Sequence, residues 1–510
     1  MERDSRKRAE ALLAQMTATE KVGQLNQHLY GFRIYHVEDG KIIFTQELKD
    51  EVKKWGGIGT IYGLYRADPW SEKNYETGLA GGLSMQAYNQ LQKYVIEHSR
   101  LGIPFLLSSE CPHGHQALDG YLLPVNLAVG ASFDPALYER AGQVCGRQLK
   151  QMGVDFALVS ALDILRDPRW GRSEECYGED PYLSAELARA IVTGIQKEGV
   201  AVVAKHFCAQ GETTGGVNAS AARIGERELW EIHLQAAKAC CEAGVKGIMA
   251  AYNEIDGKFC HANRHLLQDI LRRDWGFNGA VVTDWGGSND HALGVKNGST
   301  LEMPAPGGDA VRELMRAVET GKITESDVNA RLSELLTLVF DTHTAVEKHS
   351  RSFDAEAHHA LVRRAAAESI VLLKNEENLL PLATGTGVAV IGDFAETPRY
   401  QGAGSSAVNS LKVDTVLDNL AHSGLQVLGF APGFDRRGRA DAVKEAEAVA
   451  LARQADVAVL FLGLDEIKES EGLDRGDMKI ADNQIELLRA VQAVNPNTVV
   501  VVNAGASIET

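Results

Sequence analysis

Short apolar runs alternate with amphipathic helical stretches over the first two-thirds of the sequence, and this alternation restricts the fold more than any other feature. Such runs, rich in β-branched residues, are typical of buried strands in a parallel sheet, and the stretches between them are typical of the covering helices. The predicted strands are Ile58–Tyr62, Ile103–Ser108, Val154–Ser160, Ala201–Phe207, Gly247–Tyr252, Gly279–Asp284 and Ser299–Met303. The predicted helices include one that ends at Arg100 and others at Arg227–Ala243 and Arg312–Glu319. Seven such units favour an α/β fold with a (β/α)8 TIM-like barrel over an open sheet.

A polar stretch, Thr342–His359, interrupts this pattern and is typical of a linker. The alternation then resumes, with predicted strands at Val388–Ile391, Leu425–Gly429, Val457–Leu462 and Val499–Asn503 and helices at Ala442–Arg453 and Gln484–Val494. We therefore predict a barrel domain over 1–341, a linker over 342–365 and a smaller α/β domain over 366–510. No helix follows the last predicted strand, and a half-covered α/β layer would expose an apolar face, so we expect the second domain to be truncated at its C-terminus.

Charge and cysteine content narrow the class of protein. With 52 Lys and Arg against 69 Asp and Glu, the net charge is −17, which argues against nucleic acid or an anionic membrane as partner. The opening residues, MERDSRKRAEALLAQM, are charged and contain no apolar signal-peptide core, which predicts a cytoplasmic protein. The seven cysteines are odd in number and lack CxxC spacing, which favours a reducing compartment. The sequence leaves a homo-oligomer open.

The stretch GFNGAVVTDWGGSND, residues 276–290, contains the most informative strand. Its apolar core is followed by Asp284 and Trp285. In barrel enzymes and open α/β enzymes, the catalytic groups lie at the carboxyl ends of the parallel strands, which is the position of this carboxylate. The tryptophan offers a flat apolar face that suits a sugar ring. On this stretch alone, a second interpretation is equally good: Asp284 could cap the next helix and Trp285 could fill the core.

Other polar residues follow the other predicted strands. Those after the second to fifth strands are Glu110 with His113, Arg169 with Arg172, Lys205 with His206, and Tyr252 with Asn253. Because the carboxyl ends of parallel strands meet at one edge, these side chains predict a pocket that hydrogen-bonds sugar hydroxyls. A zinc site at His113 and His115 is disfavoured, since the spacing lacks HExxH and a third ligand. The segment Gln401–Ser406 lacks phosphate-loop spacing and is predicted to be a loop of the second domain that faces the active site.

Ordered motifs run through most of the chain: EKVGQL, GGIGTIYG, DPRWGRSEECYGEDPYL, KHF, AYNEIDG, LLQDILRRDWGFNGAVVTDW, AAAESIVLLKNEENLLPL and ESEGLDR. In these motifs the sequence resembles glycoside hydrolase family 3, of the two-domain β-glucosidase and β-xylosidase type. The resemblance implies a retaining exo-glycosidase with a (β/α)8 barrel, a linker and an (α/β)6 sandwich. It also implies that no metal or organic cofactor is needed, and that members usually continue beyond a VVVNAG-type strand.

The resemblance assigns roles to individual residues. Asp284 matches the catalytic nucleophile, and Glu471 of ESEGLDR matches the general acid/base. Glu110, Arg172, Lys205, His206 and Tyr252 match positions that bind the non-reducing sugar, with Trp285 beside them. Two positions depart from the pattern: KHFCAQGETTGG lacks a sugar-binding arginine found in some β-glucosidases, and Glu110 stands where many family glucosidases have Asp and many xylosidases have Glu.

Retention of configuration requires one ionised and one protonated carboxyl group. We expect Asp284 to be ionised beside Lys205 and the arginines, and Glu471 to keep its proton through repulsion from Asp465, Glu466 and Glu469. Either glutamate of that acidic run remains an alternative acid. The predicted function is a β-glucosidase. The alternatives are a β-xylosidase or α-L-arabinofuranosidase of the same family, a metal-dependent barrel hydrolase, and a catalytically silent sugar-binding protein.

Overall fold

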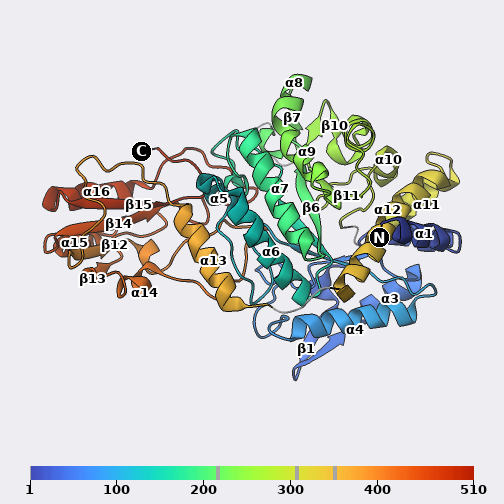
Figure 1. Ribbon diagram of the computed structural model, residues 1–510, viewed down its shortest axis with the longest axis horizontal. Helices are drawn as coiled ribbons and strands as arrows, with labels where there is room; N and C mark the ends of the chain where they lie inside the picture. The colour runs from blue at the N-terminus through green and yellow to red at the C-terminus, as the bar shows by residue number, and fades with distance from the viewer. Residues whose placement is uncertain (1, 214–218, 305–308, 349–352, 510) are drawn as a thin grey trace. The chain divides into compact units, whose positions relative to one another are not determined.

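The computed structural model describes residues 2–213, 219–304, 309–348 and 353–509, and its backbone contacts divide the chain into two units (Figure 1). The first unit contains 1–166, 175–368 and 406–411, and the second contains 167–174, 369–405 and 412–510.

The first unit is built on a six-stranded parallel sheet whose strand order is β11-β8-β6-β5-β4-β3. The strands are β3 Thr60–Tyr62, β4 Leu106–Glu110, β5 Phe156–Ser160, β6 Ala201–Phe207, β8 Gly247–Ala250 and β11 Ala280–Thr283. Every residue in these strands is buried, as expected for a parallel sheet covered on both faces. Six of the seven strands predicted for this domain are therefore confirmed, with ends shifted by a few residues.

Two short extended segments continue this sheet from β11 round to β3. In the predicted seventh strand, only Leu301 and Glu302 pair, so that strand is shorter than predicted. Leu301 bridges to Val282 of β11, and Glu302 bridges to Asn26. Tyr30, in the same segment as Asn26, bridges to Tyr62 of β3. These parallel bridges complete a ring, so the predicted TIM-like barrel is confirmed.

Helices cover the outside of this barrel, and their ends follow sequence signals. Helices α6 and α7 each begin with an aspartate cap, Asp134 or Asp180, followed by proline in the first turn. The helices are α1 Glu2–Leu13, α2 Ala18–Gln24, α3 Gln46–Trp55, α4 Leu83–His98, α5 Asn126–Ser132, α6 Pro135–Gln151, α7 Pro181–Lys197, α8 Glu226–Glu228, α9 Gln235–Glu242, α10 His291–Asn297, α11 Asp309–Glu319, α12 Glu325–Lys348 and α13 Ala355–Glu368. Two π-helical segments, Leu229–His233 and His265–Asp274, add further turns, and the first of them divides the helix predicted at 227–243.

Small sheets lie outside the barrel. The hairpin of β1 Tyr35–Glu38 and β2 Lys41–Phe44 is antiparallel, and β7 Ala221–Ala222, β9 Glu254–Ile255 and β10 Lys258–Phe259 form a second sheet.

The described part of the predicted linker, 342–365, is largely helical. It contains the end of α12 and most of α13, and α13 packs against α5 and α6 of the first unit. Residues 349–352 of this stretch lie outside the described residues. The boundaries 1–341, 342–365 and 366–510 stay predictions.

The second unit contains a four-stranded parallel sheet with the order β13-β12-β14-β15. The elements are β12 Gly387–Ile391, α14 Val416–Leu420, β13 Gln426–Ala431, α15 Ala442–Ala452, β14 Val457–Gly463, α16 Asp482–Val494 and β15 Thr498–Asn503. All four strands and both helices predicted here are confirmed. Helix α15 packs on β12 and β13, and α16 packs on β14. Valines on β13 and β15, such as Val427 and Val500, stay about 40% exposed.

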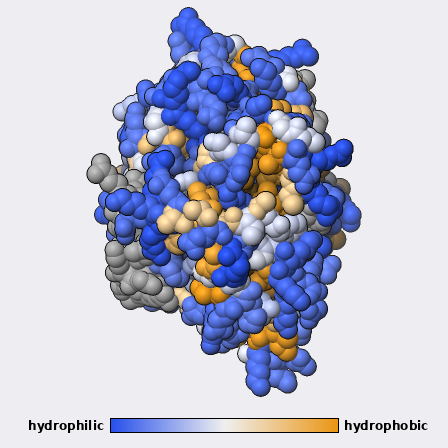
Figure 2. Space-filling model, turned by 90° about the vertical axis from the view of Figure 1, so that its right-hand side faces the viewer, coloured by the Kyte–Doolittle hydropathy of each residue, from blue (hydrophilic) through white to orange (hydrophobic). Residues whose placement is uncertain are grey.

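Over the described residues, none of the helices combines the length and the apolar composition that a membrane span requires. The face of the molecule in Figure 2 is mostly hydrophilic, with smaller apolar patches between polar side chains.

Closure of the barrel depends on the absence of a side chain at Gly59. A Cβ at this position would lie 2.0 Å from the carbonyl oxygen of Gln24, in the segment that leads to Asn26 and Tyr30. We expect Gly59→Ala to lower the free energy of unfolding by about 1–3 kcal/mol, because backbone atoms would have to move apart. Gly82→Ala is the control, since only the tip of Gln86 comes within 4 Å there. Urea unfolding that finds both variants equally stable would contradict the closure described here.

Candidate active site

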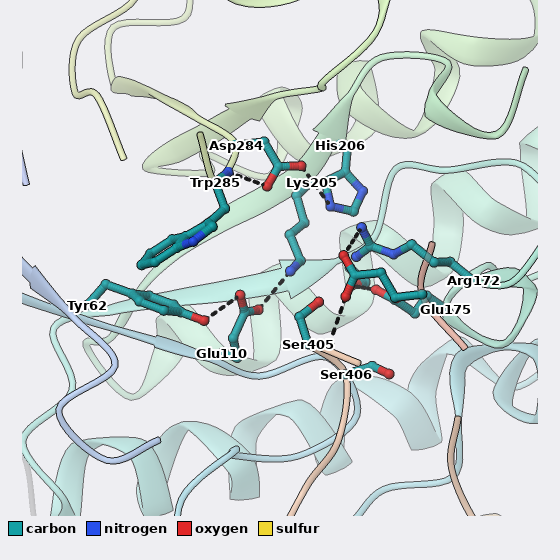
Figure 3. A network of polar contacts seen from close by, with 12 residues as sticks. Tyr62, Glu110, Arg172, Glu175, Lys205, His206, Asp284, Trp285, Ser405 and Ser406 are labelled. Atoms are coloured by element: carbon teal, nitrogen blue, oxygen red, sulfur yellow. Dashed lines mark hydrogen bonds and ion pairs between the residues drawn. The ribbon is translucent and has the colours of Figure 1, made fainter. Parts of the chain in front are cut away.

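Glu110 and Lys205 form a buried ion pair at the carboxyl ends of β4 and β6. Lys205 Nζ lies 2.7 Å from Glu110 Oε2, although 95 residues separate the two in the chain (Figure 3). Tyr62, the last residue of β3, donates from its hydroxyl to the other oxygen, Glu110 Oε1, at 3.2 Å. Three strand ends therefore converge on one carboxylate, as their sequence positions predicted for Glu110 and Lys205.

Asp284 follows the last residue of β11 and is buried. Its Oδ1 accepts a hydrogen bond from the backbone N–H of Trp285 at 2.7 Å, which fixes the orientation of the carboxylate. Its Oδ2 has no hydrogen-bond partner among the described residues and lies 3.6 Å from His206 Nε2. The carboxylate thus has one anchored oxygen and one buried oxygen that faces His206 (Figure 3).

His206 is oriented by Asp163, a residue that the sequence analysis missed. Asp163 Oδ2 lies 2.6 Å from His206 Nδ1 and accepts from the backbone N–H of His206 at 3.2 Å. Because Nδ1 faces this carboxylate, Nε2 is the ring nitrogen left to face Asp284. Asp163 comes three residues after β5 ends, so the rule that located Glu110 and Lys205 could have found it too.

Aromatic rings extend the site away from these charges. The Trp285 ring packs against Tyr62, with centroids 4.6 Å apart, and against Trp70 at 5.3 Å and 88°. Tyr30 contacts both tryptophans. The Tyr252 ring lies beside Gly287, where an added Cβ would be 3.3 Å from Tyr252 Cδ1. Thr214 to Gly216, in the segment that departs from the family pattern, lie outside the described residues.

Arg172 and Glu471 lie together in the second unit. Arg172 Nη1 donates to Glu471 Oε1 at 3.1 Å, and the Ser405 N–H donates to Glu471 Oε2 at 2.8 Å. The predicted loop Gln401–Ser406 therefore holds Glu471 through Ser405, and Gly404 at φ 116° leaves room for the glutamate, because a Cβ there would lie 2.5 Å from Glu471 Cβ.

Two of the three acidic residues that were predicted to keep Glu471 protonated have cationic partners of their own. Like-charge repulsion within the acidic run requires uncompensated neighbours, but Glu466 pairs with Arg436 at 2.8 Å and Glu469 pairs with Arg399. Glu469 also accepts from the Gly505 N–H at 3.1 Å. Each of these glutamates thus has its own guanidinium, and the donors around Glu471 stabilise its negative charge.

One group of metal-type ligands occurs among the described residues: Glu212, Glu228 and His233. The π-helical turn places His233 near Glu228, and burial lowers the pKa of His233 to about 4. Arg166 already donates to both carboxylates, at 2.7 and 3.3 Å, and supplies the positive charge that they need. His115, in the disfavoured zinc motif, instead contacts Ser109 Oγ at 2.8 Å through Nε2.

Comparison with known proteins identifies the family. The model of the glycosyl hydrolase family 3 N terminal domain matches residues 17–338, and that of the C-terminal domain matches 370–510. The chain belongs to glycosyl hydrolase family 3. It is 37% identical to the thermostable beta-glucosidase B of Acetivibrio thermocellus and to an exo-alpha-(1->6)-L-arabinopyranosidase of Bifidobacterium longum, in each case over 80% of this chain and 56% of the relative. The chain therefore spans just over half the length of these curated relatives.

A solved family 3 structure agrees with this fold. The GH3 beta-glucosidase of Bifidobacterium adolescentis matches with a TM-score of 0.79 at 32% identity, over 98% of this chain and 64% of that one. Both expected parts of the family 3 architecture, a TIM-like barrel and an α/β sandwich domain, are thus confirmed.

Loss of Asp163 should destabilise the first unit, because the Nδ1 and backbone N–H of His206 would be left buried without an acceptor. We expect Asp163→Ala to lower the free energy of unfolding by about 1–3 kcal/mol. Asp50→Ala, on the exposed face of α3, is the control and should change it by less than about 0.5 kcal/mol. Equal unfolding midpoints in urea for the two variants would show that Asp163 does not hold His206.

Proposed function

We propose that this protein is a retaining, exo-acting β-glycosidase that hydrolyses terminal non-reducing β-D-glucosyl residues from oligosaccharides or glycosides. Membership of glycosyl hydrolase family 3 supports a glycosidase, and the similarity to proteins named beta-glucosidase supports glucose. The single observation that carries the proposal is the Asp284 carboxylate, with one oxygen anchored by Trp285 and the other free of hydrogen bonds among the described residues.

In this proposal Asp284 is the nucleophile. Its free Oδ2 attacks the anomeric carbon and forms a covalent glycosyl-enzyme, while Oδ1 stays fixed by the Trp285 N–H. His206 and Lys205 bind sugar hydroxyls and stabilise the charge that develops in the transition state. Glu110 accepts from a hydroxyl of the same sugar, and Trp285 and Tyr252 cover its apolar face.

Glu471 is proposed as the general acid/base, with Arg172 beside it as a sugar-binding residue. It first donates a proton to the leaving oxygen and later removes one from water, which requires the two carboxyl groups to come within about 5–5.5 Å in the working enzyme. The Arg172 and Ser405 donors favour its ionised form, which is the form required for the second step.

Glu110 keeps a second candidate sugar open. Many family xylosidases have glutamate here, so a β-xylosidase or α-L-arabinofuranosidase is the alternative within the family. A catalytically silent sugar-binding protein is the alternative of another class. A panel of aryl β-glucoside, β-xyloside, α-arabinoside and β-N-acetylglucosaminide separates them, since a silent protein hydrolyses none. The proposal includes a cytoplasmic location and a small-molecule glycoside as the partner. It is compatible with a homo-oligomer.

Covalent labelling tests the role of Asp284. After incubation with a 2-fluoro glycoside, the mass of the intact protein should rise by one sugar, and the label should map to Asp284. Asp284→Ala should lower activity by several orders of magnitude, because no neighbouring group can replace a nucleophile. A label on another carboxylate would contradict the assignment.

Azide rescue tests the role of Glu471. Glu471→Ala should cripple hydrolysis of alkyl glycosides and spare the first step on a dinitrophenyl glycoside, whose leaving group needs no proton. Added azide should restore turnover of the dinitrophenyl glycoside, since it replaces the activated water. Glu466→Ala is the matched control, because Glu466 lies on the same loop as Glu471, is half exposed and pairs with Arg436.

Two outcomes would overturn this assignment. Azide rescue of Glu466→Ala or Glu469→Ala and not of Glu471→Ala would move the acid/base within the acidic run. Rescue of Glu110→Ala alone would move it to the barrel. Because Glu469 is buried against Arg399 and Gly505, we expect Glu469→Ala to lose stability instead of gaining azide dependence.

A further inference from the structure

A buried chain of hydrogen bonds leads from the loop after β3 to the sugar-binding Glu110. Arg66 Nη1 lies 2.7 Å from the hydroxyl oxygen of Tyr62, and the Tyr62 hydroxyl lies 3.2 Å from Glu110 Oε1. Lys205 completes the chain on the other carboxylate oxygen at 2.7 Å. All four residues are at least nine-tenths buried.

The chemistry of the donors fixes the direction of this chain. A guanidinium can only donate, so the oxygen of Tyr62 must accept from Arg66. The single hydroxyl proton of Tyr62 then points to Glu110. Burial, and after it the charge of Glu110, raise the pKa of Tyr62 well above its usual value, so the phenol keeps this proton. Glu110 therefore receives a protein donor on each oxygen.

Arg66 is itself held from two other sides. Asp68 Oδ2 accepts from Nε and Nη2, both at 2.6 Å, and Asp68 Oδ1 accepts from the Ser71 N–H at 2.8 Å. The face of the Trp70 ring lies 4.5 Å from the guanidinium carbon. The loop after β3 thus fixes the guanidinium that fixes Tyr62.

We propose that Arg66 and Tyr62 are positioning residues that make Glu110 specific for a sugar hydroxyl that donates to it. This inference rests on the proposed function, because it assumes that Glu110 binds the glycone. A carboxylate held by donors on both oxygens keeps one orientation and can only accept from the sugar. A sugar without that hydroxyl leaves a buried charged acceptor partly unsatisfied, which is the strongest form of discrimination that a polar site offers.

The test compares kcat/KM for 4-nitrophenyl β-D-glucoside with that for its 3-deoxy, 4-deoxy and 6-deoxy analogues. Glu110→Gln identifies the hydroxyl that Glu110 binds, because this variant should no longer distinguish the parent glucoside from the analogue that lacks that hydroxyl. Tyr62→Phe keeps the ring contact with Trp285 and removes only the hydroxyl. We expect Tyr62→Phe to lower the ratio of kcat/KM for the parent glucoside to kcat/KM for that deoxy analogue about tenfold, mainly by lowering kcat/KM of the parent. The ratios for the other two deoxy analogues should stay unchanged.

Arg66→Met should have the same positional effect, and Arg66→Lys should restore part of the discrimination through a single donor to Tyr62. Tyr88→Phe is the matched control, because it also removes a buried phenol hydroxyl bonded to a carboxylate, that of Asp155 at 3.1 Å. The partners of the Tyr88 hydroxyl, Asp155 and Gln92, lie outside the proposed sugar-binding residues. Tyr88→Phe should leave all three ratios unchanged, as a purely structural effect would not select one hydroxyl.

Two results would overturn the proposal: unchanged discrimination in Tyr62→Phe and Arg66→Met, or an equal fall at all three positions. Failure of the proposed function has a different signature, since the wild-type protein would then hydrolyse none of the four glucosides. In that case calorimetric titration of glucose and its deoxy derivatives supplies the same ratios as binding constants, with the same criteria.

Discussion

The ion pair between Glu110 and Lys205 is the interaction around which the barrel site is built. It joins side chains from β4 and β6, the two neighbours of β5, at the end of the sheet where Asp284 also emerges. Burying either charge alone would be costly, so each residue needs the other in place. Tyr62 and Arg66 on one side and Asp163 with His206 on the other extend this pairing into a network in which most polar atoms have partners. Three polar atoms at this edge of the network, Asp163 Oδ1, His206 Nε2 and Asp284 Oδ2, have no hydrogen-bond partner among the described residues.

The sequence predicted the parts of this arrangement that depend on strand ends. A buried apolar run followed by a polar residue located Glu110, Lys205 with His206, and Asp284, because side-chain direction at the end of a parallel strand is fixed by the sheet. The same reasoning located all four strands of the second unit. The same reasoning overestimated the length of the seventh strand of the barrel. Ser299–Met303 has the apolar composition of a strand, but only two of its residues pair, because the barrel is closed there by single bridges.

Hydrogen-bond partners could not be predicted in the same way. Arg66 lies in the loop after β3, where the backbone path decides what a side chain reaches, and no spacing rule gives that path. The position of Asp163 after β5 points to the right edge of the sheet, but it does not identify His206 as the partner. The arginine partners of the acidic residues near Glu471 could not be predicted from the sequence either. The acidic run around Glu471 suggested mutual repulsion, yet Arg399 and Arg436, 30 or more residues distant in sequence, neutralise Glu469 and Glu466. Family resemblance supplied the proposed role of Glu471, which composition alone would have left as one of four acidic residues between 465 and 471.

The stereochemistry of the first product tests the central claim most directly. With an aryl β-glucoside as substrate, proton NMR follows the anomeric signals before mutarotation mixes them. A double displacement through Asp284 predicts that β-glucose appears first and that the α-anomer grows only at the rate of mutarotation. Initial release of the α-anomer would mean a single displacement by water, and it would contradict the nucleophilic role of Asp284 and the account built on it.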